Sequence, residues 1–291
     1  MALILFSTTD MRGPRRADFT RLLDSLERNA KGGQALRSYI LLQNCPHAQL
    51  AMLQTKAPAC CRLTAIESRC SVSVARNLLI AAALECEPFG ADDIVGFPDD
   101  DCWLPDHFAG SLANVFAELE DLDVLICKVA GKPDLRAFAA RDIVPASTRQ
   151  IVRVTTSNSM FFRGPVFVRV GRFNPALGVG TPNGGGEDTD YVIRAFLAAR
   201  RAGIIDRPVV AHPEPDQDSA AKYYRGALIV LARHAGGSQA LMREFLRKLL
   251  VGGYFVVRRK LSLSALLAAF WDALRTRRTG EPSLTSGATR P

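Results

Sequence analysis

Residues 92–105 of the chain, DDIVGFPDDDCWLP, decide the fold. The apolar first half predicts a buried strand, and three adjacent aspartates, Asp99, Asp100 and Asp101, follow it directly. Three carboxylates at the end of a buried strand repel one another and need a cation or donor groups beside them. An acidic surface turn would be the preferred explanation of a bare aspartate triplet. The strand before it and the Trp-Leu-Pro after it favour a binding site at the edge of a sheet.

Strand and helix patterns alternate on both sides of this stretch. Alternation of this kind predicts an α/β fold with a mostly parallel sheet. Strands are expected at residues 2–7, 36–44, 61–66, 92–98 and 123–129, and helices at 17–29, 73–85, 187–202, 219–234 and 238–250. The carboxyl ends of parallel strands line the ligand crevice, so Thr8, Thr9 and Asn44 should converge there with the aspartates.

The chemistry of the aspartates indicates a divalent metal. Hard oxygen ligands suit Mg²⁺ or Mn²⁺, the ions that commonly bridge a diphosphate. His212 follows an apolar stretch and precedes Pro213, and its neutral imidazole is a candidate for a further ligand. A lone histidine of this kind can equally be structural.

A second acidic segment reads GGGEDTD at residues 184–190. The glycines deliver Glu187 and Asp188 to the first turn of a helix, where the helix dipole is expected to keep both carboxylates ionised. An ionised carboxylate that faces the crevice can remove a proton from a sugar hydroxyl. Ordinary helix capping by Asp188 or Thr189 is the alternative interpretation.

Arg76 and Asn77 open the helix that follows the third strand. From this position they could reach a phosphate or a base, and a solvated arginine is the alternative.

The net charge of +8 is concentrated near the C-terminus, since residues 243–278 hold nine basic residues against two acidic ones. This asymmetry argues against a nucleic-acid groove spread over the main domain. Residues 254–278 combine cationic and apolar side chains and could lie on an anionic membrane surface, or could form a helix that packs on the domain. No membrane-spanning helix and no secretory leader are expected, and the odd, irregularly spaced cysteines suggest reduced thiols in a cytosolic protein.

Together these motifs resemble the inverting GT-A glycosyltransferases of family 2, the group that builds bacterial polysaccharides. The resemblance covers roughly residues 2–235 and rests on the order and spacing of a first strand ending in polar residues, Ala75-Arg76-Asn77, Gly96 to Asp101, Gly186 to Asp190, and His212. It implies that Asp101 binds the metal, that Asp99 holds the ribose or the metal shell, that Asp100 assists, that Asp188 is the catalytic base beside Glu187, and that His212 completes the metal site. Thr8, Asp10, Asn44, Arg76 and Asn77 would border the nucleotide. A Pro-x-Tyr-Asn type of turn after the first strand and a glycine near Cys70 and Ser71 are missing.

The resemblance also implies a domain plan and partners. Residues 1–235 would form the GT-A catalytic domain, with a Rossmann-like nucleotide-binding half at 1–130 and an acceptor-side half at 131–215. Residues 236–278 would form a basic amphipathic helical extension, and residues 279–291 are expected to be disordered. The donor would be a nucleotide-diphosphate sugar and the acceptor a saccharide or lipid-linked saccharide, with the protein cytoplasmic or peripheral on the inner face of the membrane, and with no nucleic-acid partner.

Two other functions fit the same acids. A sugar-phosphate nucleotidyltransferase also uses paired aspartates and Mg²⁺, but it should carry a Gly-rich basic loop directly after the first strand, and residues 12–16 (RGPRR) match this poorly. A non-catalytic, membrane-associated module that binds a divalent ion or a sugar would keep the acids without needing Asp188 as a base.

Overall fold

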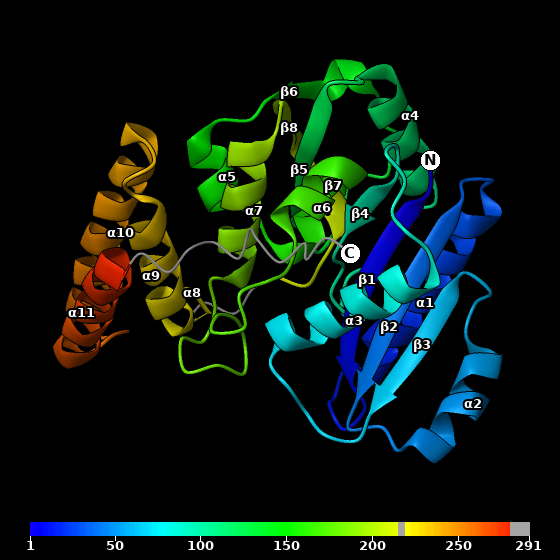
Figure 1. Cartoon of the computed structure of the whole chain (residues 1–291), viewed down its shortest axis with the longest axis horizontal. Coiled ribbons are helices and arrows are strands. Elements are labelled where there is room, and N and C mark those ends of the chain that lie inside the picture. The colour runs from blue at the N-terminus through cyan, green and yellow to red at the C-terminus, as the bar shows by residue number, and fades with distance from the viewer. Residues whose placement is uncertain (215–218, 280–291) are drawn as a thin grey trace, which may run out of the picture.

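The computed structural model describes residues 1–214 and 219–279. An eight-stranded sheet runs through the molecule, and a layer of helices stands beside it (Figure 1). The strands are β1 (Leu3–Asp10), β2 (Leu36–Gln43), β3 (Cys61–Ile66), β4 (Ile94–Gly96), β5 (Leu122–Ala130), β6 (Ile143–Pro145), β7 (Met160–Arg163) and β8 (Arg201–Ala211). The helices are α1 (Arg16–Lys31), α2 (His47–Lys56), α3 (Val72–Cys86), α4 (Phe108–Glu118), α5 (Thr148–Val154), α6 (Gly164–Val170), α7 (Glu187–Ala198), α8 (Ser219–Lys222), α9 (Tyr224–His234), α10 (Gln239–Val257) and α11 (Leu263–Thr279), with short 3-10 turns at Ala140–Asp142 and Ser157–Ser159.

The strand order is β3-β2-β1-β4-β7-β5-β8-β6. Strands β1 to β4 are mutually parallel, β7 is antiparallel to both β4 and β5, and β8 is parallel to β5. The expected mixed, mostly parallel α/β sheet is therefore confirmed. The carboxyl ends of β1 and β4 lie side by side, so the polar residues that follow them meet at one edge.

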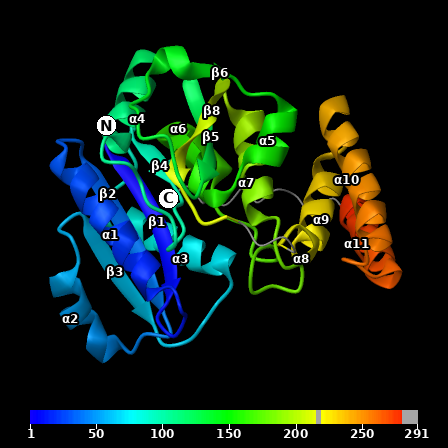
Figure 2. The ribbon, with the colours of Figure 1, turned by 180° about the vertical axis from the view of Figure 1, so that it is seen from behind.

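Both faces of the sheet are apolar. Side chains alternate across a strand, and in β1 Ile4 and Phe6 belong to one buried cluster while Leu3 and Leu5 belong to another. Helices α3, α6 and α7 complete the first cluster, and α1 and α4 complete the second. Figure 1 shows α3 in front of β1 and β2, and Figure 2, from behind, shows α1 across the opposite face.

The C-terminal helices form a layer that is attached to the sheet domain through α9. Helix α9 packs against α7 on one side and against α10 and α11 on the other. Arg153 of α5 donates two hydrogen bonds to Glu244 of α10, at 2.9 and 2.7 Å. Ala269 and Ala273 of α11 are fully buried. Of the two interpretations of residues 254–278, packing on the domain is observed, with α11 lying on α9.

The elements differ from expectation in several places. Strand β1 extends through Thr8, Thr9 and Asp10, which were expected to follow it, and the helix expected to reach residue 202 ends at Ala198 because β8 begins at Arg201. The helix expected at 219–234 is divided into α8 and α9. Helices α2 and α4 were not predicted, and neither has a side-chain cap to mark its start.

Some expectations concern residues or properties outside the sheet. All seven cysteines lie in the described part of the chain and are free. Across residues 1–214 and 219–279, no helix combines the length and apolar character needed to cross a membrane. Of the tail expected to be disordered, residues 280–291 fall outside the described residues.

Candidate active site

The aspartate loop is held in place by the strands around it. Strand β4 ends at Gly96, and the backbone N–H of Cys102 then donates to the Asp99 carbonyl at 3.2 Å, which turns the chain back. Trp103 forms an antiparallel bridge with Ala211, with backbone bonds of 3.2 and 3.0 Å. Because His212 follows Ala211 directly, this bridge places the imidazole beside the aspartates, although it comes 111 residues after Asp101 in the sequence.

Asp99, Asp101 and His212 form a cluster that can hold a metal ion. One ligand atom from each lies within 4.8 Å of the others. Asp101 Oδ1 is buried and, within the described chain, has no hydrogen-bond partner; His212 Nε2 lies 3.4 Å from it. His212 Nδ1 lies 2.7 Å from the Pro213 carbonyl oxygen, so we assign the proton to Nδ1, which leaves the Nε2 lone pair directed toward the carboxylates. A metal-binding histidine commonly has this arrangement, and the residues therefore fit a divalent ion.

The two groups stabilise each other's charged forms. Burial raises the pKa of the Asp101 carboxyl, but His212 and Arg15 more than offset it, so the net pKa is lowered. The pKa of His212 is raised, chiefly by Asp101, against the effect of burial. The site therefore carries an ionised carboxylate that positive charge must balance.

Arg15 supplies part of that positive charge. Its Nη1 lies 3.1 Å from Asp100 Oδ1 and 3.0 Å from Asp101 Oδ2, and its side chain is 53% exposed. Thr9 donates to Asp100 at 2.7 Å. Burial nevertheless raises the pKa of Asp100, since Thr9 and Arg15 offset it only in part. Sequence reasoning did not assign Arg15 to the site, because nothing in residues 12–16 shows which way the side chain turns.

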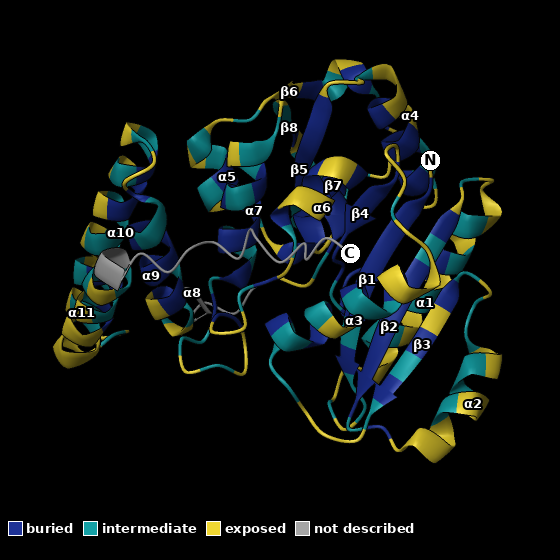
Figure 3. Cartoon of the chain, in the orientation of Figure 1, coloured by how far each residue is buried: buried dark blue, intermediate teal, exposed yellow. Residues whose placement is uncertain are grey.

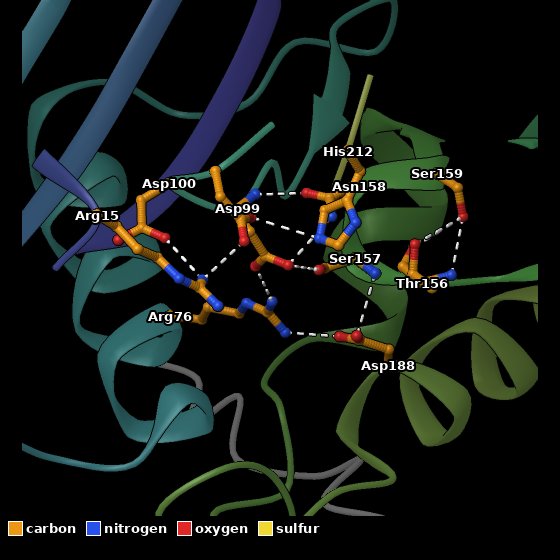
Figure 4. A network of polar contacts seen from close by, with 11 residues as sticks. Arg15, Arg76, Asp99, Asp100, Thr156, Ser157, Asn158, Ser159, Asp188 and His212 are labelled. Carbon is orange, nitrogen blue, oxygen red and sulfur yellow. Dashed lines mark hydrogen bonds and ion pairs between the residues drawn. The ribbon is translucent and has the colours of Figure 1, made fainter. Parts of the chain in front are cut away.

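Arg76 joins the two acidic motifs (Figure 4). Its Nη1 donates to Asp188 Oδ1 at 2.6 Å, and its Nη2 donates to Asp99 Oδ1 at 3.2 Å. The aspartate loop and the start of α7 are therefore cross-linked through a single guanidinium. An arginine is suited to this position because its planar fork presents several donors at fixed angles.

The environment of Arg76 differs from both sequence-based interpretations. The residue is 3% exposed, and its guanidinium lies 5.1 Å from the Phe173 ring centroid and 5.9 Å from that of Phe97. Burial lowers the pKa of Arg76, but Asp188 and Asp99 raise it by more than burial lowers it. The guanidinium is therefore always charged. A buried, fully paired side chain is not a solvated arginine. The sequence predicted that Arg76 reaches a phosphate or a base. In the structure its guanidinium binds Asp188 and Asp99 instead.

Two residues missed by sequence reasoning complete this network. Ser157 Oγ and Asn158 Nδ2 donate to Asp99 Oδ2, at 2.8 and 3.1 Å, and Asn158 Oδ1 accepts the Asp99 backbone N–H at 2.5 Å. The backbone N–H of Ser157 donates to Asp188 Oδ2 at 3.0 Å. A run of five polar residues, 155–159, directly before the buried strand β7 was the signal available in the sequence.

Glu187 and Asp188 occupy the first turn of α7 as expected. The N-cap is Gly186, at φ +93°, and it makes no side-chain cap bond, while Asp188 binds Arg76 and Ser157. The capping interpretation of Asp188 is therefore wrong. The Asp188 side chain is 22% exposed, which leaves it accessible to a substrate.

The helix dipole predicted that both Glu187 and Asp188 are ionised, and the charge state of Glu187 differs from this expectation. Burial, reinforced by Asp188, raises the pKa of Glu187 to about 8, so this carboxyl is mostly protonated at neutral pH. Burial also raises the pKa of Asp188, but Arg76 opposes it with a direct hydrogen bond. We therefore assign the negative charge of the pair to Asp188.

The remaining predicted nucleotide-side residues make no hydrogen bond to the network around Arg76 among the described residues. Asn44, at φ +53°, donates to Asp10 at 2.8 Å and lowers the pKa of that carboxyl, and the pair lies at the ends of β1 and β2. Thr8 is half-buried in β1. Asn77 uses both ends of its amide to bind the backbone of Phe173, at 2.9 and 2.8 Å. Asn77 thus positions the ring beneath Arg76, which differs from the expected nucleotide contact.

Comparison with known proteins identifies the fold. No family model and no curated protein sequence matches the chain. Among solved structures, S. aureus TarS 1-349 aligns with 95% of this chain and 81% of its own, at a TM-score of 0.66 and 17% identity. The same protein in complex with UDP-GlcNAc gives a TM-score of 0.67 at 16% identity, with the same coverage, and its complex with UDP gives 0.64 at 17%. The chain has the fold of GT-A-type glycosyltransferases, and C-terminal helices are present.

Proposed function

We propose that the chain is a metal-dependent, inverting glycosyltransferase of the family 2 type that transfers a sugar from a nucleotide diphosphate to a saccharide acceptor. The observation that carries the proposal is the pairing, through Arg76, of a metal-binding cluster with an accessible carboxylate. The ligand atoms of Asp99, Asp101 and His212 lie within 4.8 Å of one another. Asp188 lies on the other side of the same guanidinium, at 2.6 Å.

Asp188 is the proposed catalytic base. Its carboxylate is held by Arg76 at one oxygen and by the Ser157 N–H at the other. These bonds favour the charged form and fix the orientation of the carboxylate, while the partial exposure of the side chain admits an acceptor hydroxyl. Glu187, protonated at neutral pH, cannot compete for that proton. A single base that acts from one side of the sugar leads to inversion at the anomeric carbon.

The proposed metal is Mn²⁺ or Mg²⁺. Asp101 and His212 are its strongest candidate ligands, since Asp101 Oδ1 lacks another partner and His212 Nε2 is oriented toward it. Asp99 already accepts bonds from Arg76, Ser157 and Asn158, so its part is secondary. When bound, the ion supplies positive charge that neutralises the diphosphate of the donor. Arg15 adds a cation beside the same acids.

The proposed donor is a nucleotide-diphosphate sugar. Support comes from the S. aureus TarS complexes with UDP-GlcNAc and UDP, which share the fold. The proposed acceptor is a saccharide or a lipid-linked saccharide. The reaction would belong to bacterial surface polysaccharide synthesis and would take place on the cytoplasmic side of the membrane. Residues 1–235 would form the catalytic domain, in which Asp10, Asn44, Thr8 and Asp100 border the nucleotide.

The proposed activity is tested by the product that the donor releases. The protein is incubated with Mn²⁺, a mixed saccharide acceptor panel and sugars linked to uridine, guanosine, cytidine or thymidine diphosphate. We expect release of one nucleoside diphosphate, abolished in Asp188→Asn while donor binding remains. Release of pyrophosphate from a sugar phosphate and a nucleoside triphosphate would instead identify a nucleotidyltransferase. Donor binding without turnover in the wild type would leave a binding module.

A further inference from the structure

The outward sides of α10 and α11 carry large apolar side chains that the described chain leaves uncovered. Seven of them, between 49% and 80% exposed, form what we call the outer face: Leu246, Leu250, Tyr254, Val257, Leu263, Leu267 and Trp271. Within each helix they are three or four positions apart, so they lie on one side. The opposite sides are buried against the domain, as at Phe245 and Ala273. Figure 3 shows this contrast between α9, largely buried, and the two outer helices.

Basic residues interrupt the outer face at its tip. Arg258, Arg259 and Lys260 are all exposed and join α10 to α11, between Val257 and Leu263. We call these three residues the basic turn. Basic residues outnumber acidic ones around it, nine to two over residues 243–278. Residues 243–278 contain only two acids, and these already pair with Arg153 and Arg225, at 2.7 and 2.8 Å.

We propose that the outer face and the basic turn dock onto an anionic lipid surface. The apolar side chains would enter the boundary between headgroups and acyl chains, and the basic turn would pair with lipid phosphates. Tyr254 and Trp271 suit this depth, because amphipathic rings favour the membrane interface. Contiguous exposed apolar patches that carry a charged rim mark interaction sites.

Charge decides between a membrane and other occupants. A second copy of this chain would bring another face with an excess of positive charge, and its acids are already paired, so the contact would lack charge complementarity. Residues 280–291 contain one large apolar residue, Leu284, which is too few to cover seven. An anionic surface that is apolar beneath its charges matches both properties of the face.

The docking helices contact the start of α9, which packs against the glycine-rich segment. The Phe255 ring, near the tip, lies 6.1 Å from the Tyr224 ring at the start of α9. Two residues further, Gly226 packs so tightly against the Gly185 carbonyl that no side chain fits between them. Gly185 leads directly to Asp188. The docking proposal does not rest on the proposed chemistry, because vesicle binding is measured without donor or acceptor.

The test is sedimentation of the full chain with vesicles of phosphatidylglycerol and phosphatidylcholine in equal parts, or of phosphatidylcholine alone. We expect binding to the anionic vesicles only, weakened by salt. Reversing the basic turn (Arg258→Glu, Arg259→Glu, Lys260→Glu) should lower the partition coefficient by at least about a hundredfold, because it removes three attractive charges and adds three repulsive ones. A matched control reverses three exposed basic residues elsewhere (Lys56→Glu, Arg141→Glu, Arg149→Glu) and should bind like the wild type.

A second readout follows insertion itself. In a Trp103→Phe background, Trp271 is the remaining tryptophan. Its fluorescence should be quenched by brominated acyl chains in anionic vesicles. The double variant Val257→Ser and Leu263→Ser should weaken that quenching, and it tests the proposal independently of whether the charge-reversed variant folds. The proposal is overturned if the wild type ignores anionic vesicles or if the reversed turn binds as tightly as the wild type. A dimer that the same variants dissociate, with no vesicle binding, would show that a second copy covers the face.

Discussion

Replacing Arg76 with methionine removes the guanidinium that joins the two acidic motifs but keeps most of the side-chain volume between Phe97 and Phe173. Arg76 is 3% exposed and pairs with Asp188 at 2.6 Å and with Asp99 at 3.2 Å. Removal of one partner from a buried ion pair costs about 3–5 kcal/mol. Asp99 and Asp188 keep donors from Ser157 and are 36% and 22% exposed, so we place the loss at the lower end, about 3 kcal/mol.

Urea unfolding followed by circular dichroism measures this loss of free energy of unfolding. Arg76→Lys keeps the charge but can pair fully with only one carboxylate, so its loss should be smaller. Arg153→Met, which breaks the pair of hydrogen bonds to Glu244 of α10, controls for the loss of any ion pair and should leave catalysis unchanged. A loss below about 1 kcal/mol for Arg76→Met, the range of exposed pairs, would refute the reasoning that this guanidinium holds the motifs together.

Three further predictions follow from single residues. Glu187 has a pKa of about 8 in the folded protein against an ordinary 4.5, so its contribution to stability is present below pH 4.5 and is lost as pH rises through about 8. The free energy of unfolding should therefore fall between these two pH values, and Glu187→Gln should make that fall less steep. An unchanged slope in the variant would contradict the assignment. His212→Ala should weaken Mn²⁺ binding, measured by calorimetry, by about tenfold or more, because loss of even a residue that only hydrogen-bonds a metal ligand costs about tenfold. His234→Ala is the control. Gly226→Ala places a Cβ 2.0 Å from the Gly185 carbonyl oxygen and should destabilise the protein by about 1–3 kcal/mol, whereas Gly110→Ala, with no atom within 4 Å, should not lower the melting temperature.

The parallel half of the sheet was predictable because its strands are regular apolar runs that end in polar residues. Strand β3 was predicted at its observed bounds, and β2 within one residue. Strand β8 was missed because charged residues and Pro208 interrupt its apolar pattern, and its pairing with β5 shifts register there. Antiparallel β7 is short and follows a polar run, so only pairing with β4 and β5 defines it.

The candidate site was predictable in its acids and not in its cations. Asp99, Asp101 and His212 lie together because strand ends converge, and that convergence follows from strand order alone. The role of Arg76 could not be predicted, since its surroundings come from Phe97, Phe173 and Asp188, which are distant in sequence. The raised pKa of Glu187 likewise depends on burial that a helix-start pattern does not reveal.

The metal-dependent binding of a nucleotide is the central claim, and calorimetric titration tests it most directly. Uridine, guanosine, cytidine and thymidine diphosphates are titrated into the wild type and into Asp101→Asn, each with and without Mn²⁺. We predict that one nucleotide binds the wild type only with Mn²⁺ and that Asp101→Asn loses this binding. Absence of binding by all four, or equal binding by the variant without metal, would contradict the account.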